Sequence, residues 1–153
     1  MTITNIDWAE HVWNPIVGYT IASEGCTNCY AQNMAYRLEQ IEIAHQAKHG
    51  APGPLAHYLG LTHKAPRKGA RPVWTGRMAA APDETWLAPL RRKKPTRYFV
   101  NSMGDLFHPD VPDEWRDRSF AVMALAPQHV FIVLTKRADV MREYLSNISE
   151  KFV

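Results

Sequence analysis

The chain has 153 residues, of which 46% are hydrophobic and 22% are charged, and its formal net charge is +3. This length suits one domain with a buried core, and the composition is that of an ordinary soluble globular protein. No apolar run reaches the roughly 18 residues of a membrane span, and the N-terminal MTITNIDWAEH has neither the basic nor the apolar region of a secretory signal. We therefore expect a single cytoplasmic domain, residues 1–153, with no membrane partner and with its two cysteines reduced.

A strand is predicted over residues 11–18, followed by a helix from about Thr27 to about Lys48. Aromatic and aliphatic residues recur in that helix at helical spacing, from Tyr30 to Ile41. A segment rich in proline and glycine then ends the helix. This basic segment, residues 49–72, is long for a simple connection, so it predicts an insertion, a lid or a mobile loop.

Three further strand–helix pairs are predicted after this insertion. In chain order, these strands and helices cover residues 73–80, 83–94, 97–103, 112–125, 129–137 and 138–145. The strand at 129–137 is apolar as far as Thr135, which is typical of a strand buried on both faces. Four consecutive strand–helix units predict an α/β fold with a parallel sheet and right-handed crossovers. The chain would form an open sheet or half of a TIM-like barrel, because a whole barrel needs roughly 200 residues.

In parallel α/β folds, side chains that bind or react gather at the carboxyl ends of the strands. In this chain that rim is predicted to comprise Asn14, Trp74, Arg77, Asn101, Ser102, Asp105, His108, Lys136 and Arg137, next to Cys26 and Cys29. Such a set suits an anionic ligand near a metal. A structural role is the alternative for each residue, since Asn101, Ser102 and Asp105 are common in loops and helix caps.

Cys26 and Cys29 form a CxxC pair at the predicted helix N-terminus, where the helix dipole favours thiolates. Two thiolates alone do not close a tetrahedral zinc site. A zinc site would need two more ligands, such as His11 and His108, and nothing in the spacing specifies them. A thioredoxin-like redox pair and two small buried hydrophobes are the other interpretations of the pair.

Basic residues concentrate between residues 64 and 97, where only Asp83 and Glu84 oppose them. The predicted basic patch comprises Lys64, Arg67, Lys68, Arg91, Arg92, Lys93 and Lys94. A patch of this kind suits nucleic acid or another anionic partner. It is equally typical of a solvated loop and of a helix C-terminus, where cations offset the helix dipole.

The segment 7-DWAEHVWNPIVGYTIASEGCTNCYA-31 resembles the phage three-Cys-motif proteins, a radical-SAM-like family of unknown function. The resemblance continues, in the same order, through residues 74–77, 100–137 and 141–145. The family pattern reads approximately W-N-P-x-x-G-C-x6-C-x-x-C-Y-A, so Cys26 and Cys29 match its second and third cysteines. Tyr19 stands where the remaining cysteine ligand would be, and the chain is shorter than the members of that family.

The resemblance implies a barrel-like α/β domain, a [4Fe–4S] cluster, and S-adenosylmethionine bound at the open iron of the cluster. Members of the family look distantly like DNA-repair lyases, which implies a nucleic-acid substrate. A phenol is a poor substitute for a thiolate on iron, because clusters prefer soft anionic donors. With Tyr19 in the ligand position, we expect that the cluster and S-adenosylmethionine are lost here.

These features predict a phage-type binding protein that keeps a degenerate radical-SAM-like site and acts without catalysis in the cytoplasm of a bacterial host. Its target is expected to be a host defence complex, for example as a CRISPR inhibitor, or nucleic acid. The alternative is an iron–sulfur radical enzyme that modifies or repairs nucleic acid and is completed by a partner chain. A small zinc or redox module is the third interpretation. A half barrel leaves its last strand unpaired, so we also expect a homodimer or a protein partner at that edge.

Overall fold

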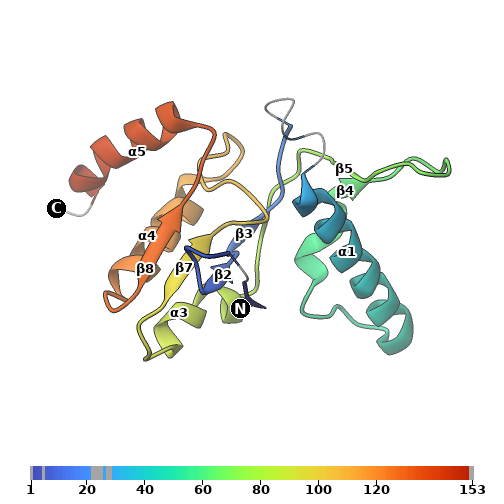
Figure 1. Ribbon diagram of the computed structural model, residues 1–153, viewed down its shortest axis with the longest axis horizontal. Coiled ribbons are helices and arrows are strands. Elements are labelled where there is room, and N and C mark those ends of the chain that lie inside the picture. Colours follow the sequence, from blue (N-terminus) through green and yellow to red (C-terminus); the bar gives the residue numbers. More distant parts are fainter. Residues whose placement is uncertain (1, 5, 22–25, 27–28, 152–153) are drawn as a thin grey trace.

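The main sheet of the computed structural model has four strands in the order β1-β2-β7-β8 (Figure 1). The structure describes residues 2–4, 6–21, 26 and 29–151, and the predicted helix start at Thr27 lies outside these residues. The strands of this sheet are β1 (Thr2–Ile3), β2 (His11–Trp13), β7 (Arg97–Val100) and β8 (Val130–Val133). β2, β7 and β8 are parallel, and β1 is antiparallel to β2. The predicted α/β fold with a parallel sheet is therefore confirmed, and the sheet is open.

Helices pack against one face of this sheet. In chain order they are α2 (Asp83–Trp86), α3 (Ala88–Arg91), α4 (Asp113–Ala124) and α5 (Ala138–Lys151). Trp13, Tyr98 and Val100 point to this face, where they form one buried cluster with Val122 of α4. Figure 1 shows α4 directly behind β8. No helix in the described part of the chain is long and apolar enough to cross a membrane.

The helix predicted over residues 83–94 is divided into two short helices, α2 and α3, at Leu87. Pro89 supplies the physical reason, because it has no N–H to donate in a continuous helix and its ring clashes with the carbonyl one turn back. The Leu87 N–H still bonds to the Asp83 carbonyl at 2.9 Å, whereas the Leu90 N–H bonds to the Leu87 carbonyl at 3.1 Å and starts the tighter second helix. The predicted helical character is right, but its continuity is wrong.

The single strand predicted over residues 73–80 is wrong. Its two ends are separate short strands, β5 (Val73–Trp74) and β6 (Ala79–Ala80), which pair antiparallel with β4 (Thr62–His63) and β3 (Ile16–Val17), respectively. Gly76 lies between them with φ +87°, a left-handed conformation that turns the chain and interrupts the strand. The parallel part of the described main sheet therefore has three strands instead of the predicted four.

The strand predicted over residues 11–18 is also divided, into β2 and β3. Pro15 lies at the break and has no N–H for a sheet ladder. Asn101 stabilises the break, because its N–H donates to the Trp13 carbonyl at 2.8 Å and its Oδ1 accepts from the Ile16 N–H at 3.3 Å. The chain then leaves the main sheet and runs past the carboxyl end of β7.

A second group of elements lies beside the sheet (Figure 1). It consists of α1 (Tyr30–His49), the 3₁₀-helix η2 (Ala56–Tyr58) and the β4–β5 pair. Tyr58 is buried against α1, and the Glu42 carboxylate of α1 accepts hydrogen bonds from the Gly53 and Leu55 N–H groups at 2.6 and 3.2 Å. Residues 53–63 therefore pack on α1 as part of the insertion.

The apolar stripe of α1 faces solvent. Tyr30 is 57% exposed and Ile41 is 48% exposed, although both follow the helical spacing of a core face. The buried face consists instead of the small residues Ala31 and Ala35 and of carboxylates that bind the insertion. Small side chains let the insertion approach closely, and the carboxylates satisfy its backbone N–H groups. The spacing predicts the helix correctly but not the face that is buried.

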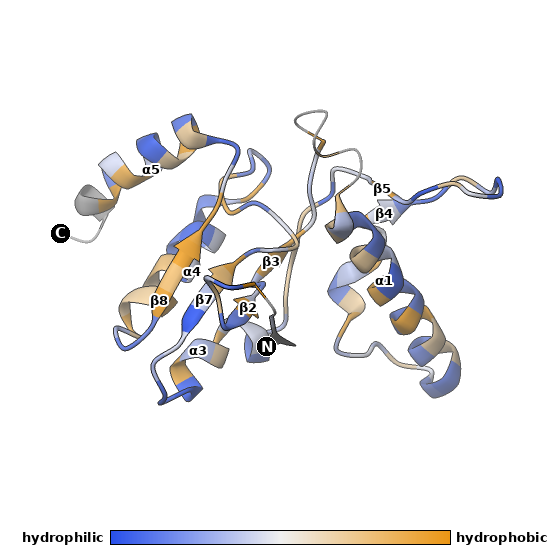
Figure 2. Cartoon of the chain, in the orientation of Figure 1, coloured by the Kyte–Doolittle hydropathy of each residue, from blue (hydrophilic) through white to orange (hydrophobic). Residues whose placement is uncertain are grey.

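The face of the main sheet opposite the helices is apolar and only partly covered. Phe99 and Ile132 on this face are half-buried, and Leu134 beyond β8 is 53% exposed. Figure 2 shows β8 as a hydrophobic segment with α4 behind it, whereas β7 is hydrophilic at its start and hydrophobic toward its carboxyl end. β8 is an edge of the described sheet and Val130 is 56% exposed, so the prediction that this strand is buried on both faces is wrong.

Candidate functional site

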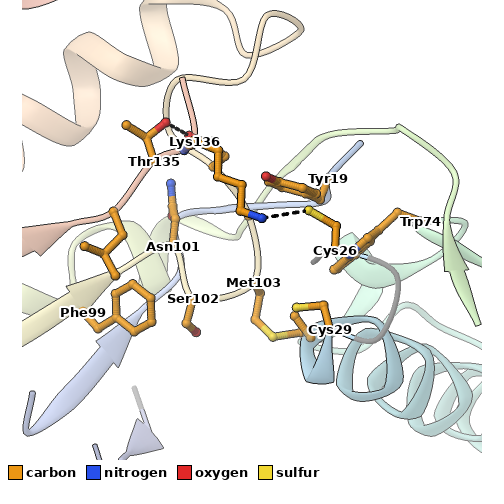
Figure 3. Close-up of a pocket in the computed structure, with 14 residues that line it drawn as sticks. Tyr19, Cys26, Cys29, Trp74, Phe99, Asn101, Ser102, Met103, Thr135 and Lys136 are labelled. Carbon is orange, nitrogen blue, oxygen red and sulfur yellow. Dashed lines mark hydrogen bonds between the residues drawn. The ribbon is translucent and has the colours of Figure 1, made fainter. Parts of the chain in front are cut away.

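The carboxyl ends of β7 and β8 meet the start of α1 at a cavity of about 230 Å³ (Figure 3). The predicted site residues that line this cavity are Tyr19, Cys26, Cys29, Trp74, Asn101, Ser102, Asp105 and Lys136. They come from four separate parts of the chain, namely residues 19–29, Trp74, residues 101–105 and Lys136. The predicted gathering of polar residues and cysteines at the carboxyl end of the sheet is therefore found for these residues.

Two glycines bring Tyr19 to the cavity. Gly18 has φ +105°, and a Cβ at this position would lie 2.1 Å from the Arg77 carbonyl oxygen, so only glycine fits. A parallel bridge joins Gly18 to Gly104, and the Gly18 N–H donates to the Met103 carbonyl at 3.0 Å. This bridge places Tyr19 beside the loop that follows β7.

The Cys26 side chain is buried beside a phenol and an ammonium group. Lys136 Nζ donates a hydrogen bond to Cys26 Sγ at 3.2 Å, and this bond, with the negative charge of the thiolate, raises the pKa of Lys136. Burial raises the pKa of the Tyr19 phenol, and contact with Cys26 raises it further. Figure 3 shows the Lys136 ammonium and the Tyr19 ring on the same side of the Cys26 sulfur. The Lys136 ammonium and the Tyr19 phenol therefore both approach this sulfur.

Cys29 has different surroundings, although it lines the same cavity. It is the residue that precedes the first turn of α1, and its N–H donates to the Cys26 carbonyl at 3.3 Å. Its side chain packs against the apolar cluster that contains Met103. Figure 3 shows the Cys29 side chain next to that of Met103. The Gln32 amide of α1 also donates to the Cys26 carbonyl, which ties the CxxC turn to the helix.

The donor set of this site does not match a [4Fe–4S] cluster. Clusters of this kind are held by cysteine thiolates, and the radical-SAM-like arrangement takes three of them. Here the side chains that converge are two thiols and one phenol, and the Lys136 ammonium is already bonded to one of the sulfurs. We therefore derive no reaction step through a cluster or through S-adenosylmethionine.

Asp105 holds the two strand ends of the site together. Its carboxylate is 2% exposed and accepts hydrogen bonds from Thr135 Oγ1 at 2.7 Å, Arg137 Nη1 at 2.8 Å and the Phe107 N–H at 3.0 Å. The Arg137 guanidinium in turn lies 5.2 Å from the centre of the Tyr19 ring. Asp105 and Arg137 thus position Lys136 and Tyr19.

The Asn101 amide offers a free donor to the cavity. Asn101 is 3% exposed and has φ 56°, an unusual backbone conformation for a residue other than glycine. Its Oδ1 accepts from the Ile16 N–H, but its buried Nδ2 has no hydrogen-bond partner among the described residues. A buried amide of this kind is normally bonded, so it suits an acceptor atom of a bound ligand or water.

His108 lies outside the cavity. The Asp110 N–H donates to His108 Nδ1 at 3.1 Å, so Nε2 carries the proton and donates to Thr20 Oγ1 at 2.7 Å. Burial, and then the nearby Arg137 charge, lower the pKa of His108, so the ring is neutral and its 3.8 Å approach to Asp110 is not an ion pair. His108 is thus a loop residue.

The zinc site with His11 and His108 is not assembled. His11 lies in β2 opposite Tyr98 of β7, at the amino end of the parallel strands, whereas Cys26 lies at the carboxyl end. In the described part of the chain, no group of three or more histidine, cysteine and acidic side chains is placed to hold a metal ion. The zinc interpretation with these two histidines is wrong because the sheet separates them.

Two other predicted rim residues, Asn14 and Arg77, do not line the cavity and bond to neighbouring parts of the protein. The Asn14 Oδ1 accepts from Ser102 Oγ at 3.2 Å, and Arg77 Nη1 donates to the Leu59 carbonyl at 3.3 Å. The cavity residues that the sequence analysis missed are Ala31, Phe99, Met103, Gly104, Leu134 and Thr135. Each of them lies one or two positions from a predicted residue, so extending each motif by two positions would have found them.

The predicted basic patch is two separate surfaces. Lys64, Arg67 and Lys68 lie in the loop between β4 and β5, which projects from the side of the molecule that carries α1. Residues 91–94 lie at the end of α3 and directly after it, beside the main sheet and far from the β4–β5 loop (Figure 1). The two basic runs therefore do not form one continuous patch.

Comparison with known proteins places the chain in a family without placing it near a characterised protein. No curated protein and no solved structure matches the chain. The model of one family, described as "Protein of unknown function (DUF5131)", matches residues 3–152. Because this match covers nearly the whole chain, the protein belongs to the DUF5131 family.

Proposed function

We propose that this is a binding protein that keeps a degenerate radical-SAM-like site and works without an iron–sulfur cluster. The observation that carries this proposal is the Cys26 sulfur, which accepts a hydrogen bond from the Lys136 ammonium and contacts the Tyr19 phenol. A cluster site would have a third thiolate in place of the phenol, and the sulfurs of Cys26 and Cys29 would both bind iron. The residues present therefore support binding of a ligand or partner better than reductive cleavage of S-adenosylmethionine.

The proposed place of action is the cytoplasm of a bacterial host, with a phage-type role. Nucleic acid is the target that the exposed basic residues favour, because they suit a chain of phosphates. A host defence complex, inhibited as a CRISPR inhibitor would inhibit it, is the second proposed target. The open edge at β8 supports a homodimer or a protein partner there.

A radical-SAM-like enzyme completed by a partner chain is the second candidate function. The observation in its favour is Asn101 Nδ2, a buried donor without a described partner that lines the cavity. An enzyme that binds a small cofactor needs such fixed donors to orient it. In this alternative, the partner supplies the missing ligand to the cluster.

Anaerobic reconstitution with iron and sulfide tests whether this chain holds a cluster by itself, without a partner chain. We expect the wild-type protein to stay colourless and to retain no stoichiometric iron, because two thiols and a phenol do not complete a cluster site. The Tyr19→Cys variant is expected to gain the brown colour and the bound iron of a cluster. Tyr19→Ser is the matched control, because it removes the phenol without adding a thiolate, and it should stay colourless.

Two outcomes would contradict the proposal. A wild-type protein that binds a cluster on its own would favour the enzyme. A colourless Tyr19→Cys variant would show that the site is not radical-SAM-like, since three thiolates would then be present.

A further inference from the structure

Residues 62–74 form a β-hairpin, named here the basic hairpin, that projects away from the rest of the molecule (Figure 1). Its two strands pair through Thr62 with Trp74 and His63 with Val73. The loop between the strands contains Lys64, Arg67, Lys68 and Arg71 and no acidic residue. All four basic residues are exposed. The loop thus presents a concentrated positive charge to solvent.

The base of the basic hairpin is fixed to the core. Thr62 Oγ1 donates to the buried Glu39 carboxylate at 2.9 Å, and the Gly60 N–H donates to the same carboxylate at 2.7 Å. Leu61 is fully buried and Trp74 is 8% exposed. The charged loop is therefore held by packed structure on both sides.

The tip of the hairpin is a tight turn. The Ala70 N–H donates to the Arg67 carbonyl at 3.1 Å, and Gly69 has φ +77°, which glycine adopts without strain. Pro66 and Pro72 on either side restrict the backbone further. A restricted backbone reduces the entropy that the loop would lose on binding.

A groove runs between the basic hairpin and α1. Tyr36 of α1 lines it together with Lys64, Arg67 and Lys68, and Lys64 Nζ lies 5.1 Å from the centre of the Tyr36 ring. A groove that combines cations with an aromatic face is the arrangement with which proteins bind nucleic-acid backbones and stack bases. This combination distinguishes the hairpin from a surface that is only charged.

The second basic run, residues 91–94, has other contacts. Arg91 lies 3.9 Å from the Glu84 carboxylate, and Arg92 Nε donates to Thr96 Oγ1 at 2.7 Å. The Arg92 carbonyl also accepts from the Gln128 amide at 3.0 Å. Arg91 and Arg92 are therefore engaged with the fold. The run also provides a charge-matched control for the hairpin.

We propose that the basic hairpin binds the phosphodiester backbone of nucleic acid. This inference rests on the proposed binding function and names its partner. Each cation that neutralises a phosphate releases condensed counterions, so the affinity depends steeply on salt. Contacts to phosphates carry no base information, so the hairpin binds nucleic acid without sequence preference.

Fluorescence anisotropy with a labelled DNA duplex of about 20 base pairs, titrated over a salt series, tests the proposal. The hairpin variant combines Lys64→Gln, Arg67→Gln and Lys68→Gln. The control variant combines Arg91→Gln, Lys93→Gln and Lys94→Gln, which removes the same three charges from a chain of net charge +3. All six side chains are exposed, so thermal midpoints of both variants should agree with that of the wild type.

The wild type is expected to bind the duplex with an affinity that falls as salt rises. The hairpin variant should bind about ten-fold more weakly or worse at low salt, and the slope of log affinity against log salt should be shallower by about 3. The control variant should stay within about two-fold of the wild type. Should the triple hairpin variant misfold, the single Arg67→Gln variant is expected to make the slope shallower by about 1.

Three results would overturn the inference: no binding of DNA by the wild type, an unchanged hairpin variant, or an equal loss in the control variant. The last result would mean that net charge alone attracts DNA. Cluster reconstitution is independent of these measurements. If the hairpin does not bind DNA, the proposed binding function remains, with another partner. If the reconstitution result contradicts the proposed function, the DNA-binding result for the hairpin is unaffected.

Discussion

Single residues in this protein hold distant segments in place through buried polar groups. Asp105 is the main example, because its carboxylate bonds to Thr135, Arg137 and the Phe107 N–H and thereby joins the loop after β7 to the segment after β8. Those bonds fix the direction of Lys136, and Lys136 reaches Cys26 from there. The local geometry of the cavity thus depends on one buried carboxylate.

Replacing this carboxylate is expected to destabilise the whole domain. Asp105→Asn leaves the half-buried Arg137 guanidinium without its counter-charge, and breaking such a pair costs about 3 kcal/mol in the free energy of unfolding. Urea denaturation followed by circular dichroism measures this loss. Asp110→Asn is the matched control, because that side chain is 72% exposed, and it should change the free energy by less than about 0.5 kcal/mol. Equal values for both variants would contradict the role assigned to Asp105.

At the scale of elements, β8 combines an unpaired strand edge with exposed apolar side chains. Its outer edge has no strand partner among the described residues, and Val130 and Leu134 on its open face are 56% and 53% exposed. An unpaired apolar edge favours association with another chain. This is the physical basis for the homodimer proposed above.

Sedimentation over a range of protein concentrations tests that dimer. We expect the wild type to associate as concentration rises, and we expect Val130→Lys combined with Leu134→Lys to remain monomeric. Lysines on an edge strand oppose pairing because each chain would bring like charges to the contact. Leu125→Lys is the control, since Leu125 is 71% exposed after the end of α4 and should not affect association. A wild type that stays monomeric at every concentration would refute the dimer.

The whole molecule is expected to lose stability in acid. Burial lowers the pKa values of His11, His57 and His108, so these side chains are neutral in the folded state at pH 7. In the unfolded chain they titrate near their ordinary pKa of about 6.5 and bind protons first. By linkage, the free energy of unfolding rises with pH in this window and falls as the pH drops below about 6.5.

Thermal unfolding measured from about pH 7 to about pH 5 should therefore show a falling midpoint. His57→Gln should make this decline shallower, because it removes one of the buried rings that resists protonation. The exposed His63 is the matched position, and His63→Gln should leave the decline unchanged. A midpoint that is constant or rises toward pH 5 would contradict this account.

The sequence by itself determined the class of the fold and the position of most of the candidate site. Apolar strands that alternate with helices can be covered only in an α/β arrangement, and parallel strands bring their carboxyl ends to one edge. For that reason Asn101, Asp105 and Lys136 were correctly predicted to lie near the CxxC pair. Tyr19 was also expected beside the two cysteines, and it lines the same cavity.

Only the tertiary structure decided how residues 73–80 pair, which face of α1 is buried, and whether the basic residues form one patch. Each of these depends on contacts between segments far apart in the chain. Gly76 turns the chain so that β5 joins the insertion, and Glu42 binds backbone groups of a segment that no periodicity identifies. The periodicity of a sequence indicates which side chains share one face of a helix or strand. Whether that face is buried depends on which other segments of the chain pack against it.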